Sequence, residues 1–346
     1  MFKKSFLSAL LAVFLLLPGV AGAFEVSVDG ACLRLTPPWY LVSNSSDPDN
    51  ALCRIMLMGK DGDMTGEGAL LCISLSAPVS PESLKNMDNT ALLTLARSLD
   101  KELGFEEPLA EVRLEEMSGS PALFSVNRPQ GEQDGITSVR LFVVRGDHAF
   151  AFWASVSGGK AQADALEAIG RSFRLAPGAD AGWKTARDGS LGIAAPEGWG
   201  LTVNGAHSGT VWAVMEKRTG EEGQTTLANV ALLVHADTVA VGTKPLARLN
   251  DGSDEPLIFL ALGSRGVLTD AKVSVGKTRL AGQEAQLTTI TGSFQGRPAT
   301  VELRDVTMDG KVLTLVSGWF TPLDAQSAKE LEQIYGRVQA GASAQR

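Results

Sequence analysis

The chain has 346 residues, a hydrophobic fraction of 44% and a charged fraction of 20%. This composition suits a foldable chain long enough for two domains, and it excludes disorder of the whole chain. The formal net charge of −8, without a basic cluster, argues against nucleic-acid binding, because neutralising phosphates needs Lys and Arg on one face.

The first residues have the pattern of an export signal. Lys3 and Lys4 precede an apolar run over 6–17, and residues 21–23, Ala-Gly-Ala, have the small-x-small form of a cleavage site. The run is shorter than the roughly 20 residues that a stable membrane span takes. We therefore predict a signal peptide over 1–23 and a mature protein that is exported, periplasmic or extracellular, with no stable membrane span after cleavage. An uncleaved anchor is the alternative.

Export to an oxidising compartment makes the three cysteines candidates for a disulfide. Cys53 and Cys72 lie in apolar runs on either side of a turn-rich stretch, and a hairpin centred between Gly62 and Asp63 places them opposite each other. Directly opposed residues of an antiparallel pair have Cα atoms about 4.5–5.5 Å apart, which overlaps the range that a disulfide spans. The pattern predicts a Cys53–Cys72 bond. Three buried thiols, or a bond from Cys32, are the alternatives.

One sequence pattern occurs twice along the chain. Each half begins with Asp-Gly, a short alternating strand, Pro and then Trp, and each ends with a tight turn, an apolar strand that carries a Trp, and a helix. The repeated positions, which we expect to be structural, are Pro37, Trp39, Trp153, Pro196, Trp199 and Trp319. Large aromatic residues also anchor binding surfaces, but packing in a core or at a sheet edge is the favoured interpretation.

Between these repeated ends, both halves have a similar order of predicted elements. A hairpin comes first, over 51–58 with 68–76 and over 210–217 with 226–236. A helical region follows. In the first half it starts at Pro81, and Leu92, Ala96, Leu99 and Leu103 form one apolar stripe; in the second half it resumes at Glu255. A meander of about four strands comes next. Short connections imply antiparallel pairing, and helices between and after blocks of strands give an α+β fold.

A stretch of small residues, Pro and Gly over 176–182 separates the halves. Such a stretch suits a linker, so we predict two domains, over 24–176 and 183–341.

The repeated motifs resemble those of the PsbP-like and DcrB-like family. The resemblance rests on Pro-x-Trp at 37–39, Pro-x-x-Trp at 196–199, glycine turns at 119–122 and 282–285, and the final strand–helix unit of each half. It implies two tandem α/β/α sandwiches, each a mainly antiparallel sheet flanked by helices. It also implies a non-enzymatic accessory or binding role. Tandem relatives include chaperone-like adaptors that hold apolar segments of secretion effectors; these are cytoplasmic, whereas this chain carries an export signal.

The candidate catalytic residues are few. His148, His207 and His235 have no metal-spaced partner, and the chain has no Gly-x-Ser-x-Gly elbow. We therefore predict no catalytic residue, no metal and no cofactor, and an exported accessory protein that binds an unknown protein partner in the cell envelope or an apolar segment. The alternative is a secreted hydrolase whose site assembles from distant residues. A deep cleft with one of these histidines beside a carboxylate and a serine would favour the hydrolase, and an apolar groove, or no groove, would favour the binding protein.

Overall fold

The computed structural model describes residues 23–28, 30–36, 38–43, 51–58, 63–102, 111–117, 119–128, 135–175, 182–188, 191–204, 210–219, 225–235, 268–308 and 311–340. The chain divides into two compact units, one of residues 25–181 and one of residues 182–346 with residues 1–24. The predicted signal peptide lies outside the described residues except for Ala23. Among the helices that are described, none is long and apolar enough to cross a membrane.

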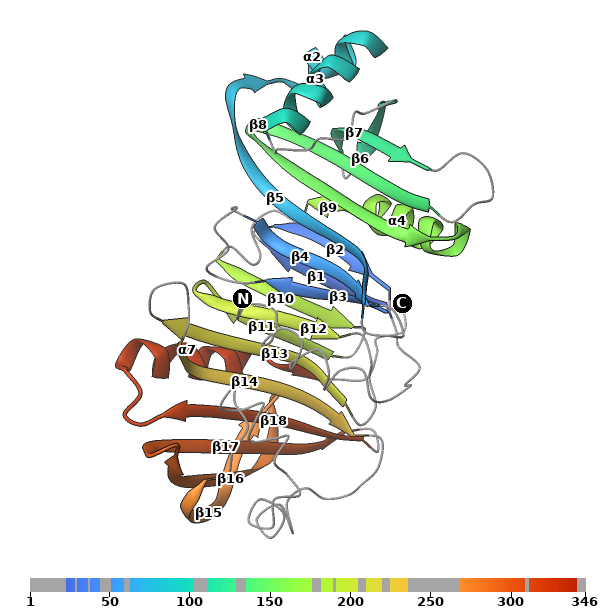
Figure 1. The fold of residues 1–346 in the computed structure, drawn as a ribbon. Helices are drawn as coiled ribbons and strands as arrows, with labels where there is room; N and C mark the ends of the chain where they lie inside the picture. Colours follow the sequence, from blue (N-terminus) through green and yellow to red (C-terminus); the bar gives the residue numbers. More distant parts are fainter. Residues whose placement is uncertain are drawn as a thin grey trace. The chain divides into compact units, whose positions relative to one another are not determined.

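The main sheet of the first unit is antiparallel, with the strand order β3-β4-β5-β8-β7-β6 (Figure 1). Its strands are β3 (Trp39–Ser43), β4 (Ala51–Met58), β5 (Met64–Val79), β6 (Arg113–Met117), β7 (Ser120–Asn127) and β8 (Gly135–Gly158). The long strand β8 has two arms, because residues 138–143 pair with β7 and residues 146–156 pair with β5. A smaller sheet has the order β1-β2-β9, with β1 (Phe24–Val28), β2 (Ala31–Leu35) and β9 (Arg174–Leu175).

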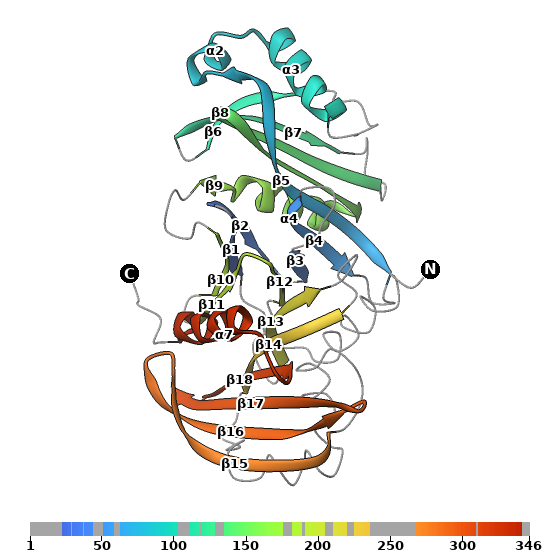
Figure 2. The same cartoon turned by 90° about the vertical axis from the view of Figure 1, so that its left-hand side faces the viewer.

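Helices cover both faces of this main sheet, as Figure 2 shows for α3 and α4. The helices α2 (Pro81–Lys85) and α3 (Asn89–Glu102) bury Leu84, Leu92, Ala96 and Leu99 against a cluster that includes Leu123 and Phe142. The helix α4 (Lys160–Arg171) packs on the other face, where a Cβ built on Gly170 would meet Val139 and Phe124. Alternate strand residues point to opposite faces, so Leu123 and Phe124 belong to different layers.

The helical region predicted from Pro81 is confirmed. Ser80 is the N-cap of α2, with its hydroxyl accepting a hydrogen bond from the backbone N–H of Ser83 at 3.0 Å. Pro81 takes the first helical position, where its missing N–H costs nothing.

The main sheet of the second unit is also antiparallel, with the order β15-β16-β17-β18-β14-β13-β12. Its strands are β12 (Trp199–Asn204), β13 (Thr210–Thr219), β14 (Thr225–His235), β15 (Thr269–Leu280), β16 (Gln283–Phe294), β17 (Arg297–Met308) and β18 (Lys311–Phe320). The helix α7 (Ala325–Arg337) packs on one face. A smaller sheet has the order β10-β11-β19, with β10 (Trp183–Asp188), β11 (Leu191–Pro196) and β19 (Gln339–Ala340). The helical segment expected after residue 254 lies outside the described residues.

The two units repeat one strand order when the two arms of β8 are counted as separate strands, in the places of β18 and β17. In each unit, a hairpin and the strand after the last helix form the small sheet. The strand that begins with Trp, β3 or β12, stands first in the order of the main sheet. The architecture is mostly antiparallel sheet with few helices, which confirms the coarse α+β prediction.

One row across each main sheet shows how closely the repeat holds. In the first unit the row runs Trp39, Leu57, Gly66 and Val156. A Cβ built on Gly66 would lie 2.7 Å from the indole of Trp39, so this position has no room for a side chain.

In the second unit the corresponding row runs Trp199, Lys217, Ala228 and Trp319. Val156, and not Trp153, thus takes the place of Trp319. Trp153 lies opposite Ala69, on the face that α2 and α3 cover. The expectation that Trp153 and Trp319 occupy equivalent positions is therefore wrong. The β5-paired arm of β8 and the strand β18 are both mostly apolar, so their sequences alone do not show that the two Trp residues stand three positions apart in the sheet.

The predicted register of the first hairpin is also wrong. Cys53 lies opposite Leu70, and Cys72 lies opposite Phe150 of β8. The β4–β5 ladder has register shifts between Ala51 and Cys53 and near Leu57, so a count from the centre of the turn does not give the pairs. None of the three cysteines forms a disulfide in the structure.

Candidate binding surface

Of the three histidines, His148 is the one whose side chain belongs to the described part of the chain. His148 is exposed on β8, opposite Ser74. His235 ends β14 opposite Val312, with its side chain outside the description, and His207 lies outside the described residues. No group of three or more His, Cys, Asp and Glu residues within the described ranges is arranged to hold a metal ion.

The repeated Pro and Trp positions divide into buried and half-buried ones. Trp39, Trp199 and Pro196 are buried, whereas Trp153 and Trp319 are half-buried. Pro37 lies outside the described residues. The two Trp residues that begin β3 and β12 thus belong to the cores of their sheets.

Trp199 also belongs to a buried polar cluster under α7. Its indole N–H donates to Oε2 of Glu330 at 2.7 Å, and the ammonium of Lys217 donates to the same oxygen at 2.7 Å. The amide of Gln326 donates to Oε1 at 2.8 Å. Burial alone raises the pKa of Glu330, but the bonds from Lys217, Trp199 and Gln326 outweigh it, so the pKa lies below its ordinary value. The cluster fixes α7 on the sheet.

Two further carboxylates are buried on the main sheets. Asp100 of α3 accepts a hydrogen bond from the guanidinium of Arg140 on β8 at 2.6 Å, and both side chains are less than one-tenth exposed. Burial raises the pKa of Asp100, and Arg140 opposes that shift. Asp305 of β17 accepts a hydrogen bond from the hydroxyl of Thr314 at 2.7 Å, and its Oδ2 has no partner. Burial raises the pKa of Asp305 as well. Neither carboxylate lines a described cavity.

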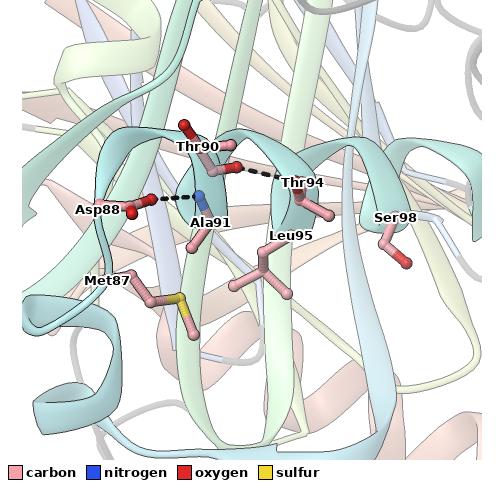
Figure 3. Close-up of a pocket in the computed structure, with 7 residues that line it drawn as sticks. All are labelled: Met87, Asp88, Thr90, Ala91, Thr94, Leu95 and Ser98. Carbon is pink, nitrogen blue, oxygen red and sulfur yellow. Dashed lines mark hydrogen bonds between the residues drawn. The ribbon is translucent and has the colours of Figure 1, made fainter.

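The outer side of α3 carries an open groove with a cavity of about 560 Å³ (Figure 3). Its lining residues come from the two positions before α3 and from the helix itself, and they are Met87, Asp88, Thr90, Ala91, Thr94, Leu95 and Ser98. The spacing of 91, 94, 95 and 98 puts these four side chains on one helix face. The groove is therefore formed by α3 and the residues that lead into it.

The polar groups in this groove are largely used within the helix. The carboxylate of Asp88 accepts a hydrogen bond from the backbone N–H of Ala91 at 2.8 Å, and the hydroxyl of Thr94 donates to the carbonyl of Thr90 at 2.8 Å (Figure 3). What remains is the apolar surface of Met87, Ala91 and Leu95. Met87 and Leu95 are only half-buried, although they also touch the core below.

The sequence pattern did not indicate this groove. It gave the inward stripe of α3 correctly, with Leu92, Ala96 and Leu99 buried. The signal that could have shown the groove is a second set of apolar and small residues on the outward side, at 87, 91 and 95.

Two further cavities are lined by arginines whose guanidinium groups already have partners. One of about 360 Å³ lies at the start of α7, where the guanidinium of Arg297 stacks 3.8 Å from the ring centroid of Phe320. The other, of about 250 Å³, lies between β7 and α4, where Arg128 and Arg171 both bind Glu167. Neither cavity is lined by a histidine or a cysteine.

Comparisons with known proteins give similarity of structure only. No protein-family model and no curated protein matches the chain. The apo structure of the T6SS immunity protein TplEi from Pseudomonas aeruginosa is 12% identical, with a TM-score of 0.32, over 92% of this chain and 97% of that one. The Tle4–Tli4 complex is 9% identical, with a TM-score of 0.32, over 92% and 97%. Cyanobacterial PsbP from Synechocystis sp. PCC 6803 is 14% identical, with a TM-score of 0.31, over 48% of this chain and 97% of that one.

Proposed function

We propose that this chain is an exported, non-catalytic accessory protein that binds a protein partner through an apolar segment seated in the groove of α3. The observation that carries the proposal is the groove itself. It is open to solvent, its surface is mostly apolar, and the side chains of Asp88 and Thr94 bond to backbone groups of the same segment. A surface of this kind offers apolar contact and little means of binding a polar substrate.

The proposal includes the architecture that presents the groove. Both units are α/β/α sandwiches, with domains over 24–176 and 183–341. The two helical layers on the first main sheet support this, together with the repeated strand order. The partner belongs to the cell envelope, as expected for a chain whose first residues have the pattern of an export signal.

The fit between groove and partner follows from helix-in-groove recognition. A partner segment with apolar residues on one face buries them against Met87, Ala91 and Leu95, and each fully buried aliphatic side chain contributes roughly 1.5–3 kcal/mol. Ala91 lies at the centre of the stripe and is exposed, so a long charged side chain there occupies the space that the partner needs.

Replacement of Ala91 tests the proposal. The mature protein as wild type, Ala91→Arg and Gln333→Arg is immobilised and exposed to envelope extract, and bound proteins are quantified by mass spectrometry. Gln333 is an exposed position on α7 and serves as the matched control. We expect one protein whose recovery falls at least about tenfold with Ala91→Arg, which corresponds to the loss of one buried anchor, and does not change with Gln333→Arg. Equal recovery by all three proteins, or no protein retained by the wild type, contradicts the proposal.

A further inference from the structure

The last strand of the second main sheet has an open edge. The strand β15 (orange in Figures 1 and 2) has 12 residues and pairs with β16 from Lys272 to Leu280. No other strand in the described part of the chain pairs with its second edge. Val273 is 36% exposed and Val275 is 60% exposed, so solvent reaches the middle of this edge. The edge strand of the first unit, β6, has only 5 residues.

The hairpin turn between β15 and β16 decides which backbone groups point outward. Ala281 and Gly282 both have positive φ, 52° and 78°, as in a type I′ turn. Such a turn makes its flanking residues, Leu280 and Gln283, a hydrogen-bonded pair. Hydrogen-bonded and non-hydrogen-bonded pairs alternate along an antiparallel ladder, so every second residue from Arg279 directs its N–H and C=O away from β16. These residues are Val273, Val275, Lys277 and Arg279.

The side chains along the edge set its chemistry. Lys272, Lys277 and Arg279 make it cationic, with Asp270 at its beginning. The ammonium of Lys277 pairs with the carboxylate of Glu284 on β16 at 2.8 Å. Both side chains are more than two-thirds exposed, so this ion pair is weak and another carboxylate can replace Glu284 in it. A second copy of β15 added at this edge brings the same cations side by side, which is unfavourable. An acidic strand brings opposite charges together.

We propose that the open edge of β15 is a docking surface for an extended acidic segment of a partner protein, which adds to the sheet as a further strand. The outward N–H and C=O groups of Val273, Val275 and Lys277 pair with the backbone of the segment. Apolar side chains of the segment lie beside the two valines, and its carboxylates lie beside the cations. This surface belongs to the second unit and does not depend on the groove of α3.

Two variants at Val275 separate backbone pairing from side-chain contact. Val275→Pro removes an outward N–H that the β15–β16 ladder does not use, and proline is tolerated at such edge positions. Val275→Thr keeps the N–H and nearly the same shape. The probe is a fluorescein-labelled, end-blocked peptide of sequence Glu-Val-Thr-Val-Glu-Val-Thr-Glu, titrated with the full-length protein by fluorescence anisotropy.

We expect the wild type and Val275→Thr to bind this peptide within about twofold of each other, and Val275→Pro to bind it about tenfold or more weakly. A peptide with Lys in place of Glu should also bind about tenfold more weakly. Hydrogen exchange over residues 269–280 should slow when the acidic peptide binds, and exchange over 113–117 should not. Thermal unfolding of each variant reports whether the fold is kept.

A second measurement leaves the protein unchanged. Two versions of the peptide are made, each N-methylated on every second amide, so that the two versions block opposite edges of the peptide strand. Only one version should lose binding, because the peptide pairs with β15 through one of its two edges. Three results overturn the proposal. The acidic peptide does not bind at millimolar concentration; both methylated peptides bind as well as the parent; or sedimentation shows a dimer that Val275→Pro dissociates, so that a second copy occupies the edge.

Discussion

Replacing Glu330 with glutamine should destabilise the second unit by about 2–3 kcal/mol. The carboxylate is about nine-tenths buried and accepts three hydrogen bonds, from Trp199, Lys217 and Gln326. In Glu330→Gln, one oxygen can still accept from Trp199 and Lys217, but the other acceptor becomes an NH2 group that faces the donor of Gln326. The ammonium of Lys217, whose side chain is 18% exposed, also loses its counter-charge. Hydrogen bonds to charged groups contribute about 1.5–3 kcal/mol each, and an uncompensated, partly buried charge adds to the loss.

The matched control is Glu332→Gln on the same helix. The Glu332 side chain is 72% exposed and lies 3.6 Å from Arg304, so its loss should cost less than about 0.5 kcal/mol. For a unit of this size, 1 kcal/mol corresponds to about 2–4 °C in the midpoint of thermal unfolding. Calorimetry of the full chain at pH 7 should therefore show a shift of roughly 4–12 °C for Glu330→Gln and little change for Glu332→Gln.

The pH dependence gives the sign of the electrostatic part. Because the pKa of Glu330 is lowered in the folded state, its ionised form contributes stability that is fully present above the ordinary glutamate pKa of about 4.3 and is lost as the pH falls through the lowered value. The stability difference between wild type and Glu330→Gln should therefore be constant from about pH 6 to 8 and shrink below about pH 4. A shift no larger than that of Glu332→Gln, or a difference that grows in acid, would refute the reasoning.

Three further changes test other parts of the structure. Gly170→Ala should lower the free energy of unfolding in urea by about 1–3 kcal/mol, because the new Cβ lies 2.8 Å from Cγ1 of Val139. In the control Gly336→Ala in α7, the new Cβ meets no atom within 4 Å, so the free energy of unfolding should rise by up to about 1 kcal/mol. Equal effects would contradict the packing described for α4. Asp305→Asn should stabilise the protein by about 1 kcal/mol at pH 8. The raised pKa of Asp305 means that its ionised form makes the folded state less stable, so the gain should vanish near pH 4, where the carboxyl group is protonated. Destabilisation at pH 8 would show that the buried charge is paired. Protein isolated from an oxidising compartment and alkylated in denaturant without reductant should take three adducts, one on each cysteine. A single adduct would show that a disulfide joins two of them.

The sequence predicted those features that depend on periodicity and local chemistry. The inward stripe of α3, the Ser80-Pro81 start and the two hairpins are local patterns, and a single stretch of chain contains all the information that they need. The duplicated order was also readable, because both halves begin with a Trp-initiated strand.

Features that depend on pairing across strands were less predictable. A register shift beside Cys53 moves its partner from Cys72 to Leu70, and bulges of this kind have no clear signature in one strand. The non-equivalence of Trp153 and Trp319 arises in the same way, since two apolar strands of similar composition align in more than one frame. The groove of α3 and the edge of β15 depend on what other elements leave uncovered, which no single segment encodes.

The row that contains Gly66 has a consequence for how the two halves have diverged. Trp39 fills the space that a Cβ at position 66 needs, whereas Trp199 stands in a row that accommodates Ala228. Both rows begin with Trp, yet one has Gly66 where the other has Ala228, so a residue that fits in one half does not fit at the equivalent position of the other. Substitutions within a row are coupled, and Gly66→Ala becomes tolerable only when position 39 carries a smaller side chain. A strand transferred from one half to the other would therefore not pack unless the residues of its row on the neighbouring strands were transferred as well.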